Sequence, residues 1–136
     1  IIVDYLQLMN SPKRIDNRVQ ENSEITRSLK LMAKDLNIPV VAMAQLSRAN
    51  TQRADKTPML SDLRDSGSIE QDADIVLLFH RENYYQTGMD VPDENADQNE
   101  CQIIVAKNRH GETKTILTHW QGEFMRFTAR EVIRHE

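Results

Sequence analysis

The chain has 136 residues, of which 39% are hydrophobic and 28% are charged, and its formal net charge is −4. These values fit one soluble globular domain or part of one, and no run of about 18 apolar residues predicts a membrane span. Cys101 is the single cysteine. One cysteine cannot form an internal disulfide or a thiolate zinc cluster, so the sequence favours a reducing, cytoplasmic environment.

The negative charge is unevenly distributed along the chain. Residues 90–100 (DVPDENADQNE) contain five carboxylates and no base, and without them the remainder would carry a small net positive charge. Basic clusters lie within residues 13–18, 48–56 and 107–114. Local fields, rather than the total charge, decide where a polyanion binds. Solvated surface is the alternative interpretation for each cluster.

A strand, a helix and a second strand are predicted in the first third of the chain. Residues 1–3 (IIV) are typical of a buried parallel strand. Asn17, with Gln20 three residues later, resembles a capping box that starts the helix, and Asn37 ends it. One apolar helix face is predicted from Ile25, Leu29, Met32, Ala33 and Leu36. Residues 38–44 (IPVVAMA) predict a second buried strand, and this order implies a right-handed parallel crossover.

The remainder of the chain predicts a long polar loop over 47–60, short helical turns over 61–74, and then a series of strands. The four predicted strands are 75–80, 101–107, 114–120 and 123–129. NRHG, residues 108–111, predicts a turn between the second and third of them. The sequence thus indicates an α/β fold with parallel strand–helix units first and an antiparallel meander last.

Two polar residues follow the first two predicted strands. Asp4 comes directly after the first strand, and Gln45 follows the second. If these strands are neighbours, both side chains lie at the carboxyl edge of the sheet, where open α/β sheets bind ligands. Asp4 is then a candidate Walker B acid that orients Mg²⁺ beside a nucleoside triphosphate, and Gln45 a candidate partner of the γ-phosphate. A turn-capping carboxylate and a polar strand end are the structural alternatives.

Two further segments have the residue types that bind phosphates. Lys107 and Arg109 are two positions apart, so on a strand they would point the same way and suit a phosphate or a carboxylate. In LRDSGS, residues 63–68, Gly67 would let backbone N–H groups approach a phosphate closely. A solubilising hairpin and an ordinary turn are the alternatives.

Together, the order and spacing of these motifs resemble the DnaB family of bacterial replicative DNA helicases, whose motor domain has a RecA-like fold. IIVDYLQLM (1–9) resembles the family's Walker B motif, VVAMAQLSR (40–48) its nucleotide-sensing Gln motif, and KNRHG (107–111) its arginine-finger hairpin. SDLRDSGSIEQDAD (61–74) is the most specific, because it matches the family's signature segment nearly throughout. Residues 1–136 are therefore expected to be the C-terminal portion of a RecA-like P-loop ATPase core.

The resemblance implies ATP and Mg²⁺ as cofactors and assigns a role to each polar residue near them. Asp4 would be the Walker B acid, and Gln45 would couple the γ-phosphate to the DNA-binding loops. Lys107 and Arg109 would reach the ATP held by the next of six identical subunits, where a finger cation stabilises charge in the transition state.

The resemblance also implies contacts with single-stranded DNA. Arg64, Asp65 and Gly67 would lie on a loop that lines the central channel, and Arg14 and Arg18 are further candidates for the same channel. Contacts of this kind hold the DNA backbone rather than base edges, so binding should be insensitive to sequence.

A P-loop requires G-x-x-x-x-G-K-[ST], and none of the four glycines precedes Lys-Ser or Lys-Thr. The resemblance implies that the P-loop, the catalytic glutamate and a primase-contacting N-terminal domain lie upstream of Asp4. We therefore expect the fragment alone to be inactive, whereas the intact parent hydrolyses ATP and moves 5′ to 3′. It would work at the replication fork in the cytoplasm, with primase and a helicase loader as partners.

Two other interpretations remain open from the residues themselves. One is another RecA-like ATPase of the recombinase type, against which residues 63–74 argue. The other is a non-enzymatic interaction fragment, which would dock a partner through the helix over 17–37 or the acidic segment.

Overall fold

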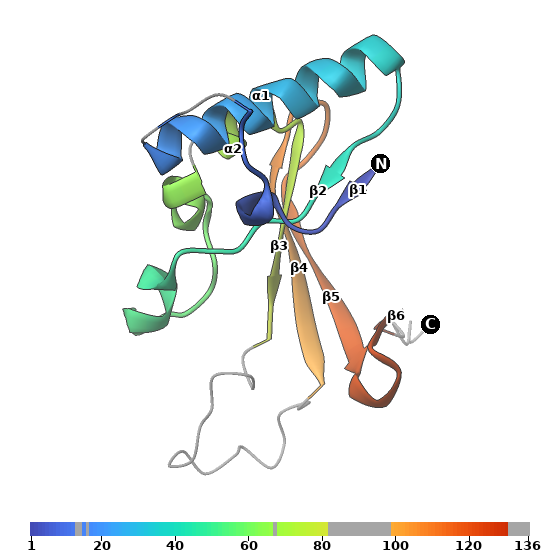
Figure 1. Cartoon of the computed structure of the whole chain (residues 1–136). Helices are drawn as coiled ribbons and strands as arrows, with labels where there is room; N and C mark the ends of the chain where they lie inside the picture. The colour runs from blue at the N-terminus through green and yellow to red at the C-terminus, as the bar shows by residue number, and fades with distance from the viewer. Residues whose placement is uncertain (13–14, 16, 67, 82–98, 131–136) are drawn as a thin grey trace.

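The computed structural model describes residues 1–12, 15, 17–66, 68–81 and 99–130, which form two sheets and one long helix. The parallel pair consists of β1 (Ile2–Val3) and β2 (Val41–Ala42). The antiparallel meander consists of β3 (Ile75–His80), β4 (Glu100–Asn108), β5 (Lys114–Gln121) and β6 (Arg126–Ala129), in that order. Helix α1 (Arg18–Leu36) crosses over the long strands near one end (Figure 1). The predicted α/β architecture is therefore confirmed.

The ends of α1 are set by two asparagines. The Asn17 Oδ1 accepts a hydrogen bond of 2.9 Å from the Val19 N–H, which satisfies one of the free N–H groups of the first turn. Asn37 ends the helix in the left-handed conformation, with φ of 50°, and its N–H bonds back to the last turn. Both predicted helix ends are confirmed, but Leu36, predicted to lie on the apolar face, is exposed.

Short helical turns connect the strands. They are η1 (Leu6–Leu8), η2 (Arg48–Gln52), η3 (Leu60–Ser66), α2 (Ile69–Asp72) and η5 (Gly122–Phe124). The turn η5 occupies part of the predicted last strand, so β6 begins only at Arg126, after Met125 in the left-handed conformation.

The first two strands are neighbours and parallel, as predicted, but they are short, and of their four residues only Val3 is partly buried. Ile2 pairs with Val41 and Val3 with Ala42. Ile2 and Val41 are 71% and 55% exposed. A parallel sheet is buried only when elements cover both of its faces, and the described part of the chain places no second layer over these two residues.

The meander contains one irregularity in its register. Val76 pairs with Lys107, whereas Leu77 pairs with Val105, so Ala106 has no partner across the strands. This is the arrangement of a β-bulge, which reverses the side-chain alternation beyond it. Lys107 therefore shares the face of Val76, which belongs to the buried core, and not the face of the exposed Leu77.

The core lies between α1, the short helical turns and one face of the meander. Its buried residues are Leu6, Ile25, Leu63, Ile69, Val76 and Leu78. The opposite face of β3 stays exposed at Ile75, Leu77 and Phe79. The alternation of buried and exposed positions along β3 is the pattern of a strand with one covered face.

The left-handed conformation at Asn37 gives a test of the helix end. Asn37→Val should lower the free energy of unfolding by about 1–2 kcal/mol, because a β-branched side chain is strained at positive φ. Asn37→Gly, the matched control, should remain within about 0.5 kcal/mol of the parent, because glycine adopts this conformation freely. Thermal unfolding followed by circular dichroism would measure both, and equal melting temperatures for the two variants would contradict the assignment.

Candidate functional site

Asp4 and Gln45 lie at the same edge of the parallel pair. The ladder continues beyond both strands, since the Met43 N–H donates to the Val3 carbonyl and the Leu6 N–H donates to the Met43 carbonyl, each at 2.9 Å. Both candidate side chains are exposed, as a group that meets a ligand must be. The carboxyl edge predicted from the sequence therefore exists and brings these two residues together.

Gln7 is a residue that the sequence reasoning did not single out. Its Nε2 donates to the Gln45 carbonyl and its Oε1 accepts from the Gln45 N–H, both at 3.2 Å. The side-chain amide thus takes the place of a backbone partner and fixes the main chain of Gln45. The only sequence signal was its position within the Walker B-like segment.

Arg18 connects this edge to the start of α1. One guanidinium nitrogen donates to the Gln7 carbonyl, and another pairs with Glu21 at 2.5 Å. The pKa of the Glu21 carboxyl is lowered, first by a hydrogen bond from the Ser11 N–H and then by the bond from Arg18. Arg18 was predicted to be a DNA contact, and the structure gives its guanidinium these partners within the chain.

Lys107 and Arg109 lie together, as their spacing predicted, and both contact the end of α2. The Lys107 Nζ donates to the Glu70 carbonyl at 2.6 Å and to the Gln71 carbonyl at 3.4 Å. The Arg109 Nη2 donates to the same Gln71 carbonyl at 3.3 Å. The bulge at Ala106 accounts for this orientation, because without it Lys107 would lie on the opposite face of the sheet.

Asp74 is a second residue that the sequence reasoning did not single out. Its carboxylate pairs with Lys30 of α1 and lies 3.5 Å from the Arg109 Nε, and its carbonyl accepts from the Arg109 N–H at 2.9 Å. The Lys30 hydrogen bond is the main cause that lowers the pKa of the Asp74 carboxyl, with a smaller contribution from the charge of Arg109. Asp74 ends the signature segment, which was the one signal in the sequence.

The two pairs of candidate residues are separate within this chain. Among the residues that the structure describes, no hydrogen bond or ion pair joins Asp4 or Gln45 to Lys107 or Arg109. Lys107 and Arg109, the finger candidates, therefore contact the end of α2 in their own chain and not the edge that carries Asp4.

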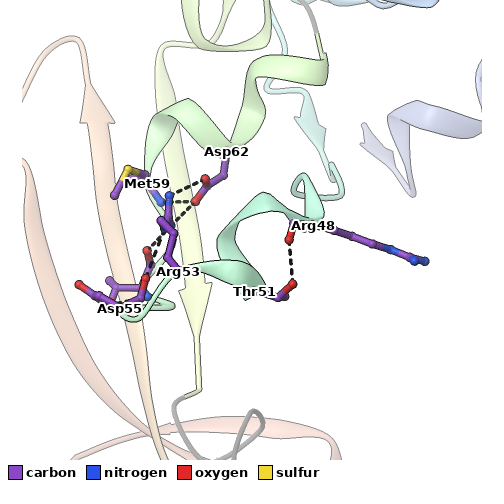
Figure 2. A network of polar contacts seen from close by, with 7 residues as sticks. Arg48, Thr51, Arg53, Asp55, Met59 and Asp62 are labelled. Atoms are coloured by element: carbon purple, nitrogen blue, oxygen red, sulfur yellow. Dashed lines mark hydrogen bonds and ion pairs between the residues drawn. The ribbon is translucent and has the colours of Figure 1, made fainter.

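The loop that follows Gln45 is held by a bidentate ion pair (Figure 2). The two terminal nitrogens of Arg53 each donate to one carboxylate oxygen of Asp62 at 2.9 Å, and one of them also donates to the Thr57 carbonyl. Asp62 is only 3% exposed. Arg53 was predicted as part of a basic surface cluster, but its guanidinium pairs with Asp62 within the loop. The Arg48 side chain points away from this pair (Figure 2).

Burial and hydrogen bonding act in opposite directions on Asp62. Burial raises the pKa of its carboxyl, but the bonds from Arg53 and from the Met59 N–H outweigh burial, so the pKa is lowered. Arg53 and the Met59 N–H thus both favour the ionised form of the carboxylate.

Most of the predicted DNA contacts lie outside what the structure describes. Arg14 and Gly67 belong to the undescribed positions, and for Arg64 and Asp65 only the backbone, in η3, is described. Their proposed role therefore stays a prediction.

The predicted Mg²⁺ site at Asp4 fits the donors that are present. Mg²⁺ keeps several waters and takes one or two carboxylates together with phosphate oxygens. Asp4 is exposed at the strand edge, so its carboxylate is available to the water shell of such an ion. The described residues contain no group of three metal-ligating side chains, so nucleotide and water would complete the shell. In the same described part of the chain, no helix is long and apolar enough to cross a membrane.

Known proteins are similar to this chain in sequence and in fold. The chain is 54% identical over 127 residues to the replicative DNA helicase DnaB of Leifsonia xyli subsp. xyli, covering 93% of this chain and 26% of that protein. It is 47% identical over 127 residues to the Haemophilus influenzae DnaB, with the same two coverages. The chain thus spans about a quarter of the length of these relatives.

Two solved structures superimpose closely on the chain. One, described as an ATPase domain, matches with a TM-score of 0.85 and 42% identity, over 96% of this chain and 44% of that one. A DnaB-like replicative helicase, described with its interactions with primase, matches with a TM-score of 0.84 and 42% identity, over 96% of this chain and 30% of that one. The chain is therefore part of an α/β RecA-like ATPase core. Residues 1–129 match the DnaB-like helicase C-terminal domain, and the chain belongs to that family.

The Arg53–Asp62 pair gives a pH-dependent test. Arg53→Met should lower the free energy of unfolding by about 2–3 kcal/mol at pH 7, because Asp62 is left buried and charged without its partner. In the parent, the folded pKa of Asp62 is lowered, so its contribution is present above the unfolded value and lost as the pH falls through the folded value. In the variant, only the hydrogen bond from the Met59 N–H still opposes burial, so the folded pKa of Asp62 is higher than in the parent and protonation relieves the penalty.

The difference between parent and variant should therefore shrink as the pH falls from 7 to about 4, measured by urea unfolding. Arg48→Met is the matched control, since this side chain lies outside the network, and it should change stability by less than about 0.5 kcal/mol. A difference that stays constant with pH would show that Asp62 does not depend on Arg53.

Proposed function

We propose that the chain is the C-terminal part of the ATPase domain of a replicative DNA helicase, which couples ATP hydrolysis to 5′-to-3′ movement along single-stranded DNA. The observation that carries the proposal is the match of residues 1–129 to the DnaB-like helicase C-terminal domain, with relatives named as replicative DNA helicases. The parent protein would unwind duplex DNA at the replication fork in the cytoplasm.

The edge formed by Asp4 and Gln45 is the proposed nucleotide site. ATP would bind at this edge together with Mg²⁺, and Asp4 would orient the ion through its water shell. Gln45 would hydrogen-bond the γ-phosphate and couple it to the loop that follows Gln45. Gln7 would hold the main chain of Gln45 in place. The rest of the site, including a P-loop, would come from another part of the parent protein.

Lys107 and Arg109 are proposed to act on the ATP of the next subunit in a ring of six. Support comes from their separation from Asp4 within the chain and from their joint orientation at the end of β4. A cation that approaches the phosphates stabilises charge in the transition state, and such a finger contributes a factor of about 10³–10⁵ to kcat.

Single-stranded DNA would contact Arg64, Asp65 and Gly67, with Arg14 and Arg18 as further contacts. Primase is a proposed partner of the parent protein, because the described interactions of a DnaB-like helicase relative include primase. A helicase loader is proposed on the same family basis.

A mixing experiment tests whether the finger acts between subunits. Arg109→Ala and Asp4→Asn variants of the full-length helicase should each lose most of their DNA-stimulated ATPase activity. In rings assembled from equal amounts, about a quarter of the interfaces pair an intact nucleotide edge with an intact finger by random assembly. Turnover should therefore return in the mixture.

Rings of each variant alone, treated identically, are the controls. Mixed rings that are demonstrated by mass spectrometry but show no recovery would place Arg109 in the site of its own subunit and contradict the proposal.

The channel contacts are tested through their salt dependence. Arg64→Ala should weaken single-stranded DNA binding and reduce the slope of log K against log salt by about 0.7, the value for one phosphate contact. Arg27→Ala, which removes an exposed cation from α1, should leave the slope unchanged. Fluorescence anisotropy at several salt concentrations would measure both, and an unchanged slope for Arg64→Ala would count against the channel role.

A further inference from the structure

Lys107 and Arg109 have defined hydrogen-bond acceptors in their own chain. The Lys107 Nζ and the Arg109 Nη2 meet at the Gln71 carbonyl, and Lys107 also reaches the Glu70 carbonyl at 2.6 Å. Carbonyl groups at the end of a helical turn are acceptors that attract cations. The two side chains are therefore held by main-chain acceptors of their own chain.

Asp74 adds a charge to these acceptors and also fixes the backbone of Arg109. Its carboxylate lies 3.5 Å from the Arg109 Nε, and its carbonyl accepts the Arg109 N–H at 2.9 Å. The Asp74 and Arg109 side chains are 46% and 47% exposed. The contact with Asp74 uses the Arg109 Nε, so the terminal nitrogens of the guanidinium can turn to a phosphate, which offers charge-assisted hydrogen bonds, while the Asp74 carboxylate still orients the group.

The segment that carries Asp74 is anchored to α1 and cannot drift with the finger. The Thr26 Oγ1 donates to the Asp72 Oδ2 at 2.8 Å, and the Ser68 Oγ donates to the same oxygen at 2.7 Å. Lys30, one helical turn beyond Thr26, pairs with Asp74 itself. Ser68 stands at the N-cap position of α2, but its hydroxyl serves this anchor rather than a cap.

We propose that Asp74 is a positioning residue for Arg109: its carboxylate orients the guanidinium through the Nε so that the terminal nitrogens can reach the nucleotide of the neighbouring subunit. This inference rests on the proposed finger role of Arg109. Asp74 would act through Arg109, while its pair with Lys30 anchors it to α1. Its loss should slow the chemical step without weakening ATP binding.

A double-mutant cycle in the full-length helicase tests this dependence. Asp74→Asn keeps the shape of the side chain and removes its charge, and it should lower the kcat of DNA-stimulated ATPase about fivefold with an unchanged KM for ATP. In the Arg109→Ala background, the same substitution should cause no further loss, because the residue through which it acts is gone.

Two further variants separate positioning from general damage. Asp74→Glu keeps the charge and should lose less activity than Asp74→Asn, and it can carry the cycle if Asp74→Asn fails to assemble. Asp35→Asn removes an exposed carboxylate from the same helix that carries Lys30 and should leave kcat unchanged. Light scattering would confirm that each variant forms rings of the parent size.

The outcomes distinguish this inference from the proposed function. A fivefold loss that persists in the Arg109→Ala background, or parent activity in both Asp74 variants, would overturn the positioning role and leave the finger role intact. Normal turnover in the Arg109→Ala single variant would overturn the finger role and this inference with it.

Discussion

One shared apolar core fixes the main chain beside four of the candidate functional residues. Leu6 lies two residues after Asp4, Ala44 and Leu46 flank Gln45, Leu63 precedes Arg64, and Ala106 precedes Lys107; all five apolar residues belong to the core or pack against it. Asp4 and Gln45 reach solvent although their neighbours are held inside. Burial of apolar area is the main favourable term in folding. The burial that stabilises the domain therefore also positions the edge that carries Asp4 and Gln45 and the hairpin of β4 and β5.

Polar contacts then connect elements that the core only brings near one another. Gln7 joins the Asp4 segment to the main chain of Gln45, Arg18 joins that segment to α1, and Asp74 joins α1 to the hairpin. Most of these groups are partly exposed, so each contact is individually weak, at about 0.2–1 kcal/mol. The exception is Arg53–Asp62, where burial makes the pair costly to break and the loop correspondingly fixed.

The sequence predicted the elements whose signals are local and missed the features that depend on distant contacts. Asn17 and Asn37 marked the ends of α1, and the strands of the meander were predicted together with the turn at 108–111. The burial of the first two strands was predicted wrongly, because β-branched residues indicate a strand but not the layers that cover it. Asp74 and Gln7 could not be assigned because their partners lie more than 30 positions away. The roles of Asp4, Gln45, Lys107 and Arg109 came from their resemblance to a family, and local physics alone left each with a structural alternative.

The unpaired Ala106 constrains how the protein can vary in length. A single residue added to or removed from β4 between Ile103 and Lys107 would shift the alternation by one and turn both finger candidates to the opposite face of the sheet. Beyond Arg109 no such parity applies, because residues 110–113 form a turn rather than a ladder. Insertions and deletions are therefore tolerable in the turn and harmful in β4. The hairpin can change its length during evolution while Lys107 and Arg109 keep their direction.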